Sequence, residues 1–193
     1  GTLAARAARH DRIVSNKGRG LITEARFVAR VGDLVGFKQA LAGALTLERA
    51  EECARIVVVG DGAPWVWAVA DDLCPTAVQV LDYPHAVQHA AEAAEVLFAP
   101  ATGLGPLFVA TIERRLRAGE IDLLLRDLEA CTFGTRGRDR AALRALTRYY
   151  RTHRNRMRYD RFRAWNLPCG SGAIESAHRH VLQKRMKLAG QHW

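Results

Sequence analysis

The sequence predicts an α/β fold in which short buried strands alternate with helices. Residues 56–60 are four consecutive β-branched apolar residues followed by glycine, a pattern typical of a strand buried on both faces. Residues 25–31 alternate between basic and apolar positions, and residues 77–81 form a second short apolar run. Segments with helical periodicity separate these three strands, which favours a sheet covered by helices.

The first of these strands, residues 25–31, has at least one end or face near solvent. Asp33 can then cap a helix whose apolar residues recur toward Cys53, namely Leu34, Phe37, Leu41, Leu45 and Leu47. Because this helix connects residues 25–31 to residues 56–60, we expect the two strands to belong to one sheet. Residues 1–10 show no cap or clear period, and residues 15–20 are typical of an exposed turn.

Asp61 stands where the central strand ends. Ligands and reactive groups collect beyond the carboxyl ends of strands in open α/β sheets, so this carboxylate is a candidate metal ligand. Gly62 permits a turn that other residues resist, and Pro64 suits the first turn of a helix, so we predict a helix over residues 64–73. The alternative is that Asp61 serves only as the N-cap of that helix.

The strand at residues 77–81 is also followed by an aspartate, Asp82. If Pro84 opens a helix, His85 and His89 lie four residues apart on one face, with Asp82 just before them. Such an Asp-x2-His-x3-His arrangement can bind a metal when one further ligand is present. The alternative is that the histidines donate hydrogen bonds.

The chain from Leu107 onward predicts helices with apolar stripes and basic faces. Between residues 136 and 163 there are eleven arginines and two acidic residues, with four aromatic residues interleaved. Arginine binds phosphate through two hydrogen bonds and aromatic rings can stack on bases, so this run predicts DNA contact as an alternative to a solvated face. The arginines expected to contact DNA are Arg148, Arg151, Arg154, Arg156 and Arg158. A helix is predicted over residues 138–157.

Composition and charge narrow the class of protein. The 193 residues are 49% hydrophobic and carry a formal net charge of +9, which suits one domain with a polyanionic partner such as nucleic acid. The chain has no apolar run of eighteen residues and no charged-then-apolar leader, so we expect a cytoplasmic protein without a membrane partner. Its four cysteines are widely spaced and form no CxxC pair, which argues against a zinc ribbon or a disulfide scaffold.

Glu175 follows a glycine–serine–glycine turn and falls in the first turn of a predicted helix that runs to about Leu188. There it faces the positive end of the helix dipole, which favours the ionised carboxylate and suits it to hold a cation. The alternative is that Glu175 is a capping-box residue.

Three ordered motifs resemble those of the Kra-type bacterial insertion-sequence transposases. They are GDGAPWVW at residues 60–67, VLDYPHAVQH at residues 80–89, and LPCGSGAIESA at residues 167–177 followed by QKRMKLAGQHW at residues 183–193. The resemblance covers most of the chain, from about Leu21 to Trp193. Three motifs in order are far more specific than any one of them.

The resemblance implies a ribonuclease-H-like mixed sheet with flanking helices, formed by residues 1–99 and 166–193, and an α-helical insertion at residues 100–165. It further implies a DNA transposase that uses two metals, Mg²⁺ or Mn²⁺, held by two aspartates and one glutamate. Asp61 resembles the second aspartate and Glu175 the glutamate, whereas the accessory motif comprises Asp82, His85 and His89. Lys184 and Arg185 join the expected DNA contacts. The implied partners are transposon ends, target DNA and further copies of the chain in a homo-oligomer.

Two departures from the family pattern change the expectation. No Asp-Gly on a strand precedes Ala25 to serve as the first catalytic aspartate, and Asp11 lacks that context. Pro84 stands where an aromatic residue is expected. We therefore expect a fragment truncated at both ends, or a decayed copy, that is inactive by itself. The alternatives are a non-catalytic basic DNA-binding remnant and a related metal-dependent nuclease.

Overall fold

The structure is a computed structural model that describes residues 2–7, 13–16, 19–22, 26–31 and 33–170. It contains both helices and strands, as the sequence predicts, and it divides into two compact units. The described residues of the first unit lie within residues 1–56 and 71–76, and those of the second within residues 57–70 and 77–170. None of the helices in these described ranges is long and apolar enough to cross a membrane.

The strands of the described residues pair as three two-stranded sheets. β1 (Thr2–Ala7) is antiparallel to β4 (Arg26–Val31), β2 (Ile13–Asn16) is antiparallel to β3 (Arg19–Ile22), and β5 (Val57–Gly60) is parallel to β6 (Val78–Leu81).

Among the described residues, β4 pairs with β1 and β5 pairs with β6, and the two pairs belong to different units, so the expectation that residues 25–31 and 56–60 share one sheet stays a prediction. A strand–helix–strand order shows which strands a helix connects, but it does not select their hydrogen-bonding partners. The partner of β4 is β1, whose alanine- and arginine-rich sequence carries no strand pattern. The predicted turn at residues 15–20 corresponds to the β2–β3 hairpin, in which Asn16 pairs with Arg19.

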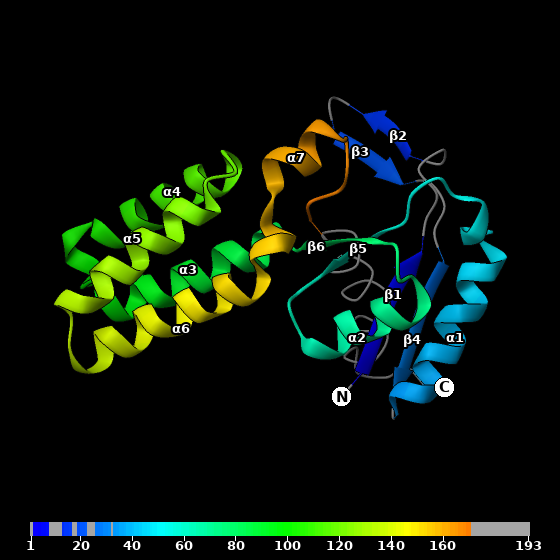
Figure 1. The fold of residues 1–193 in the computed structure, drawn as a ribbon, viewed down its shortest axis with the longest axis horizontal. Helices are drawn as coiled ribbons and strands as arrows, with labels where there is room; N and C mark the ends of the chain where they lie inside the picture. The colour runs from blue at the N-terminus through cyan, green and yellow to red at the C-terminus, as the bar shows by residue number, and fades with distance from the viewer. Residues whose placement is uncertain (1, 8–12, 17–18, 23–25, 32, 171–193) are drawn as a thin grey trace, which may run out of the picture. The chain divides into compact units, whose positions relative to one another are not determined.

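In the first unit, α1 (Leu34–Leu47) packs on β1 and β4 (Figure 1). Asp33 caps this helix as predicted, because its Oδ1 accepts a hydrogen bond from the Gly36 amide at 2.7 Å. Phe37 is 1% exposed and supplies the largest buried side chain of the helix. A short 3₁₀ turn, η2 (Ala50–Glu52), follows the helix.

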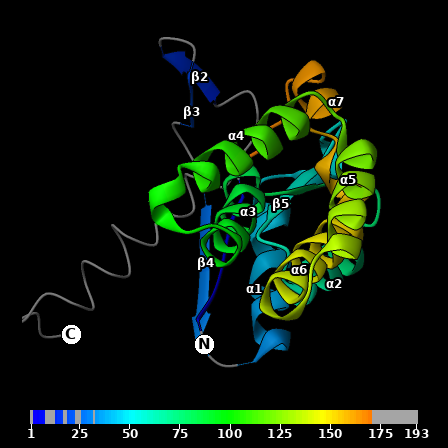
Figure 2. The same ribbon diagram turned by 90° about the vertical axis from the view of Figure 1, so that its left-hand side faces the viewer.

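In the second unit, β5 and β6 are accompanied by a set of helices. α2 (Pro64–Leu73) has the bounds that the sequence predicts, and its residues 64–70 belong to this unit. α3 (Tyr83–Leu97) follows β6. Figures 1 and 2 show α3, α4, α5 and α6 side by side, with α3 packed against α4 and α6, and α5 against α6. The remaining elements are η3 (Pro100–Thr102), α4 (Leu104–Arg117), α5 (Ile121–Gly134), α6 (Gly137–His153), η4 (Arg154–Met157) and α7 (Tyr159–Ala164).

The apolar stripes of these helices form the core. Ile112 and Leu116 of α4 are buried, as helical periodicity predicts. The buried aliphatic residues of α5 are Ile121, Leu124, Leu125 and Leu128. The helix predicted over residues 138–157 ends at His153, and a 3₁₀ turn and α7 continue the chain. Arg158, with φ −81° and ψ 57°, leaves the helical region between them. This break turns Tyr159 and Phe162 into the core.

Candidate functional site

The two aspartates that follow the parallel strands lie at the same edge of their sheet. Gly60 pairs with Leu81 in the β5–β6 register, so Asp61 and Asp82 come next at the carboxyl ends of both strands. The Asp82 amide donates to the Gly60 carbonyl at 2.7 Å, which extends the pairing to the strand ends. This is the edge at which ligands collect in parallel sheets.

The Asp61 side chain is exposed, and one of its oxygens shapes the following turn. Its Oδ1 accepts a hydrogen bond from the Ala63 amide at 2.9 Å, just before α2 begins at Pro64. This bond orders the turn that leads into α2. The Asp61 carboxylate thus combines a local structural role with access to solvent.

Tyr149 of α6 fixes the backbone at Asp61. Its hydroxyl donates to the Asp61 carbonyl oxygen at 3.0 Å. Gly62 has φ +99°, and a Cβ there would lie 2.7 Å from the Tyr149 hydroxyl and 3.2 Å from His153 Nε2, so both conformation and space require glycine. Burial raises the pKa of Tyr149, and the negative charges of Asp61 and Asp82 add to this effect, so the phenol keeps its proton as a donor.

The predicted histidines pack with this tyrosine. The His89 ring centroid lies 3.9 Å from that of Tyr149 and 6.0 Å from that of His85. His89 Nδ1 lies 3.1 Å from Glu92 Oε2. His89 is therefore held by aromatic contacts and lies beside the Glu92 carboxylate.

His153 is a second residue of α6 at this site, and the sequence pattern did not indicate it. It is 4% exposed, and its ring packs against Trp67 at 6.0 Å and Tyr149 at 4.8 Å. Its buried Nδ1 makes no hydrogen bond with any described residue. Burial lowers the pKa of His153, and the positive charge of Arg156 lowers it further, so the folded protein favours the neutral imidazole.

The donor chemistry of this edge suits magnesium, but the described residues do not complete a site. Carboxylate oxygens such as those of Asp61 are the ligands that Mg²⁺ prefers. Within the described ranges, no group of three or more His, Cys, Asp or Glu side chains can hold a metal ion. Glu175, the other predicted ligand, lies outside the described residues. The residues therefore fit the ion in kind, and their number is incomplete.

The arginines predicted to contact DNA are largely engaged within the protein. Arg151 pairs with Glu129, and Arg154 and Arg158 both pair with Asp122. Arg156 donates to Gln79 at 2.7 Å and lies 4.4 Å over the Trp67 ring. Arg148 is exposed and makes no side-chain hydrogen bond or ion pair with the described part of the chain. The other two predicted contacts, Lys184 and Arg185, lie outside that part.

The aromatic residues interleaved with these arginines do not form a stacking platform for bases. Tyr150, Tyr159 and Phe162 are at most 4% exposed and belong to the core. The Tyr150 hydroxyl donates to the Ala86 carbonyl at 2.8 Å, and that of Tyr159 to the Leu81 carbonyl at 2.9 Å. The base-stacking interpretation is wrong for these three residues, because their spacing reflects helix burial.

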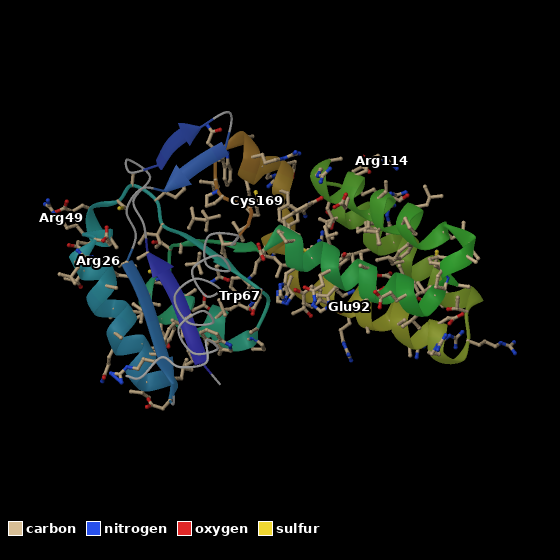
Figure 3. The ribbon with its side chains drawn as sticks, turned by 180° about the vertical axis from the view of Figure 1, so that it is seen from behind. Arg26, Arg49, Trp67, Glu92, Arg114 and Cys169 are labelled. Carbon is tan, nitrogen blue, oxygen red and sulfur yellow. The ribbon has the colours of Figure 1, made fainter. Side chains whose placement is uncertain are left out.

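A groove of about 490 Å³ runs between α3 and α6 beside this cluster. His89, Tyr149 and His153 line it, together with Arg148 and Glu92. Figure 3 labels Glu92 on α3 and Trp67 on α2. The groove therefore carries the Arg148 guanidinium and the Glu92 carboxylate next to Tyr149, whose hydroxyl holds the backbone at Asp61.

No family model, curated protein or solved structure matches this chain. A functional assignment therefore rests on the three sequence motifs and on the geometry of the strand edge.

Proposed function

We propose that the chain is part of an insertion-sequence DNA transposase that acts by two-metal phosphoryl transfer. One observation carries the proposal from the structure: the Asp61 carboxylate is exposed at the carboxyl end of β5, on the same sheet edge as Asp82. This is the position that the resemblance of residues 60–67 and 80–89 to the Kra-type transposases implies. The proposal includes a ribonuclease-H-like core, action in the cytoplasm and assembly as a homo-oligomer.

In this proposal each residue has a defined task. Asp61 and Glu175 hold divalent metal, and Tyr149 positions the Asp61 turn through its hydrogen bond to the main chain. Mg²⁺ or Mn²⁺, when bound, stabilises the attacking and departing oxygens of the phosphodiester. Basic side chains such as Arg148 hold the phosphate backbones of the transposon ends and the target DNA.

Two alternatives belong to other classes. A non-catalytic DNA-binding remnant is favoured by the lack of an Asp-Gly pair on a predicted strand before Ala25, where the family pattern has its first catalytic aspartate. A related metal-dependent nuclease would use the same strand edge without joining strands. Both alternatives keep the basic character of the chain, which has a net charge of +9.

The test compares metal binding and strand joining in wild type, Asp61→Asn and Glu175→Gln. We expect Mn²⁺ binding, followed by electron paramagnetic resonance, to weaken in both variants, because each loses one anionic ligand. DNA binding should persist in both. Mn²⁺ binding that is unchanged in both variants would contradict the metal site and favour the remnant.

Strand joining is not expected of the 193 residues, since the motifs supply two of the three carboxylates. Metal-dependent joining that both substitutions abolish would show that another aspartate completes the site. Asp82 is then the first residue to substitute, because it lies at the Asp61 edge. Asp33 is the next, although its carboxylate already caps α1. Asp11 lies outside the described residues.

A further inference from the structure

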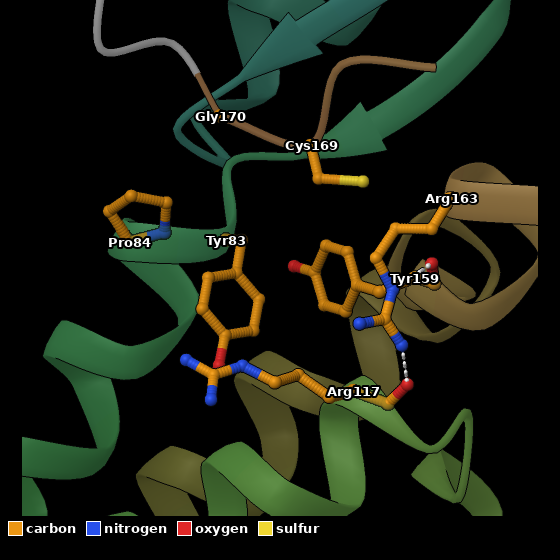
Figure 4. A pocket seen from close by; sticks show the side chains of 7 residues that line it. All are labelled: Tyr83, Pro84, Arg117, Tyr159, Arg163, Cys169 and Gly170. Atoms are coloured by element: carbon orange, nitrogen blue, oxygen red, sulfur yellow. Dashed lines mark hydrogen bonds between the residues drawn. The ribbon is translucent and has the colours of Figure 1, made fainter. Parts of the chain in front are cut away.

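A second, smaller cavity lies near the start of α3. It has a volume of about 200 Å³ and is lined by the first two residues of α3, the last residue of α4, two residues of α7 and residues 169–170. Figure 4 shows Tyr83, Arg117, Tyr159 and Arg163 around it. The Tyr83 amide donates to the Cys169 carbonyl at 2.8 Å, which ties the segment at Gly170 to the start of α3.

The cavity presents positive charge without an acidic lining residue. The Arg163 guanidinium donates to the carbonyl oxygens of Arg117 and Tyr159, so its position is fixed by the backbone. Arg117 is held less closely, since its nearest carboxylate, Glu113, lies 3.7 Å from Nη2. The Arg117 guanidinium carbon is 5.3 Å from the centre of the Tyr83 ring. Arg117 can therefore reorient toward an anion.

Tyr83 adds a neutral donor. Its hydroxyl is buried and lies beside the Arg117 guanidinium, the nearest side chain with which it can hydrogen-bond (Figure 4). Burial raises the pKa of Tyr83, Glu113 adds to the rise and Arg117 opposes it, so the phenol stays protonated at neutral pH. The Tyr159 ring meets the Tyr83 ring edge to face at 5.1 Å and closes the wall. A buried donor next to a guanidinium suits an oxyanion.

The size and position of the cavity restrict the class of ligand that it can bind. Its volume lies below the range of about 300–1,000 Å³ that is common for sites of drug-sized ligands, so it suits a small group such as a single phosphate. A Cβ on Gly170 would lie 3.6 Å from Asp82 Oδ1, which brings the rim close to the candidate site. We propose that this cavity binds a terminal phosphate, carried by a DNA strand or by a free nucleotide. The strand as its source rests on the proposed function.

The experiment uses the full chain and four probes. They are inorganic phosphate, a deoxynucleoside monophosphate, and a short single strand with either a 5′-phosphate or a 5′-hydroxyl end. Fluorescence anisotropy of strands labelled at the 3′ end, with the unlabelled probes as competitors, should show about tenfold tighter binding of the phosphorylated strand at pH 7.5. Competition by the monophosphate alone, without a preference for the phosphorylated strand, identifies a free nucleotide as the source.

Matched variants test whether the preference for the phosphorylated strand arises at the cavity. Arg117→Gln should remove the preference for phosphate, whereas Arg114→Gln should keep it. Arg114 is an exposed arginine on the same helix (Figure 3), and its substitution changes the net charge equally. Tyr83→Phe should reduce the preference about threefold through the loss of one hydrogen bond. The preference should also narrow between pH 7 and pH 5, because a phosphomonoester gains a proton near pH 6.

Equal effects of Arg114→Gln and Arg117→Gln would overturn the proposal, as would a wild type that binds neither the phosphorylated strand nor the monophosphate preferentially. Asp61→Asn separates the two hypotheses. A phosphate preference that persists while Mn²⁺ binding is unaffected by Asp61→Asn supports the cavity and contradicts the transposase site. Loss of Mn²⁺ binding in Asp61→Asn, together with no preference of the wild type for phosphorylated probes, supports the transposase site and contradicts the phosphate cavity.

Discussion

Arginines of the second unit are used in two different ways. In α6, η4 and the following residue, Arg151, Arg154 and Arg158 pair with acidic side chains of α5. At the small cavity, Arg117 lies over the Tyr83 ring and 3.7 Å from the Glu113 carboxylate, and no acidic residue lines the space that it faces. The first set joins helices, and the second leaves positive charge available to a ligand. The number of arginines in a sequence therefore does not measure the charge that a partner can reach.

Tyr159 lies beside the paired arginines and also at the small cavity, so its substitution should cause the largest loss of stability. It follows Arg158, lines the cavity and is 1% exposed. We expect Tyr159→Ala to lower the free energy of unfolding by about 3–5 kcal/mol, as for other large aromatic truncations in cores. Tyr159→Phe should cost about 1 kcal/mol, because only the hydrogen bond to the Leu81 carbonyl is lost. Urea denaturation measures both, and equal losses would show that packing of the ring is not the main contribution.

Asp122 tests whether the paired arginines stabilise the fold. Desolvation alone would raise the pKa of Asp122, but hydrogen bonds from Arg154 and Arg158 outweigh it and lower the pKa below its ordinary value of 3.8. A lowered pKa contributes stability that is full above the ordinary value and is lost as the pH falls through the folded value. Because both pairs are partly exposed, Asp122→Ala should cost about 1 kcal/mol at pH 7.

The control for this prediction is the pH dependence of the stability difference between wild type and Asp122→Ala. Urea denaturation at pH 7 and pH 5 should give the same difference between wild type and Asp122→Ala, and the difference should shrink below about pH 4. A constant difference down to pH 3 would mean that the carboxylate charge is irrelevant and that the pairs are not stabilising.

The sequence predicted local features of the fold well. The bounds of α2 follow from Gly62 and Pro64 at its start, and the cap of α1 follows from Asp33. These signals act within a few residues, so a single sequence contains them. Non-local pairing was not predictable in the same way, since β1 lacks a strand pattern and nothing in the sequence indicates β1 as the partner of β4.

The candidate site also combines a local feature, which the sequence predicts, with non-local contacts, which it does not. Asp61 was predicted because it follows a buried strand, which is a local signal. The hydrogen bond from Tyr149 to the Asp61 carbonyl joins residues 88 apart in the chain, whereas the sequence around Tyr149 indicates only an aromatic and basic run. The pairing of Asp122 with Arg154 and Arg158 is also non-local, since Arg158 lies 36 residues after Asp122. Packing of α6 beside the end of β5, and of η4 against α5, brings these groups together.

His153 of α6 should have a smaller effect, which appears in the pH dependence of the free energy of unfolding. Burial and the charges of Arg156 and His89 lower its pKa, and Asp61 opposes them. The unfolded chain takes up the proton near pH 6.5, so stability should fall as the pH drops below that value. His153→Gln should flatten the dependence of the unfolding free energy between pH 7.5 and pH 5.5. An unchanged slope would show that His153 already binds a proton in the folded protein.

The smallest expected effect concerns DNA binding and compares a free arginine with a paired one on the same helix. Arg148 makes no side-chain hydrogen bond or ion pair with the described residues, whereas Arg151, three positions later, pairs with Glu129. Each phosphate contact contributes about 0.9 to the slope of log K against log salt concentration for duplex DNA. Arg148→Gln should therefore lower the slope by about 0.9, and Arg151→Gln should lower it less, because Glu129 already neutralises that charge. Titrations of both variants from about 50 to 200 mM salt provide the measurement. Equal losses of slope would mean that Arg151 leaves Glu129 for phosphate, and the whole arginine run would then be a phosphate-binding surface, as its sequence alone suggests.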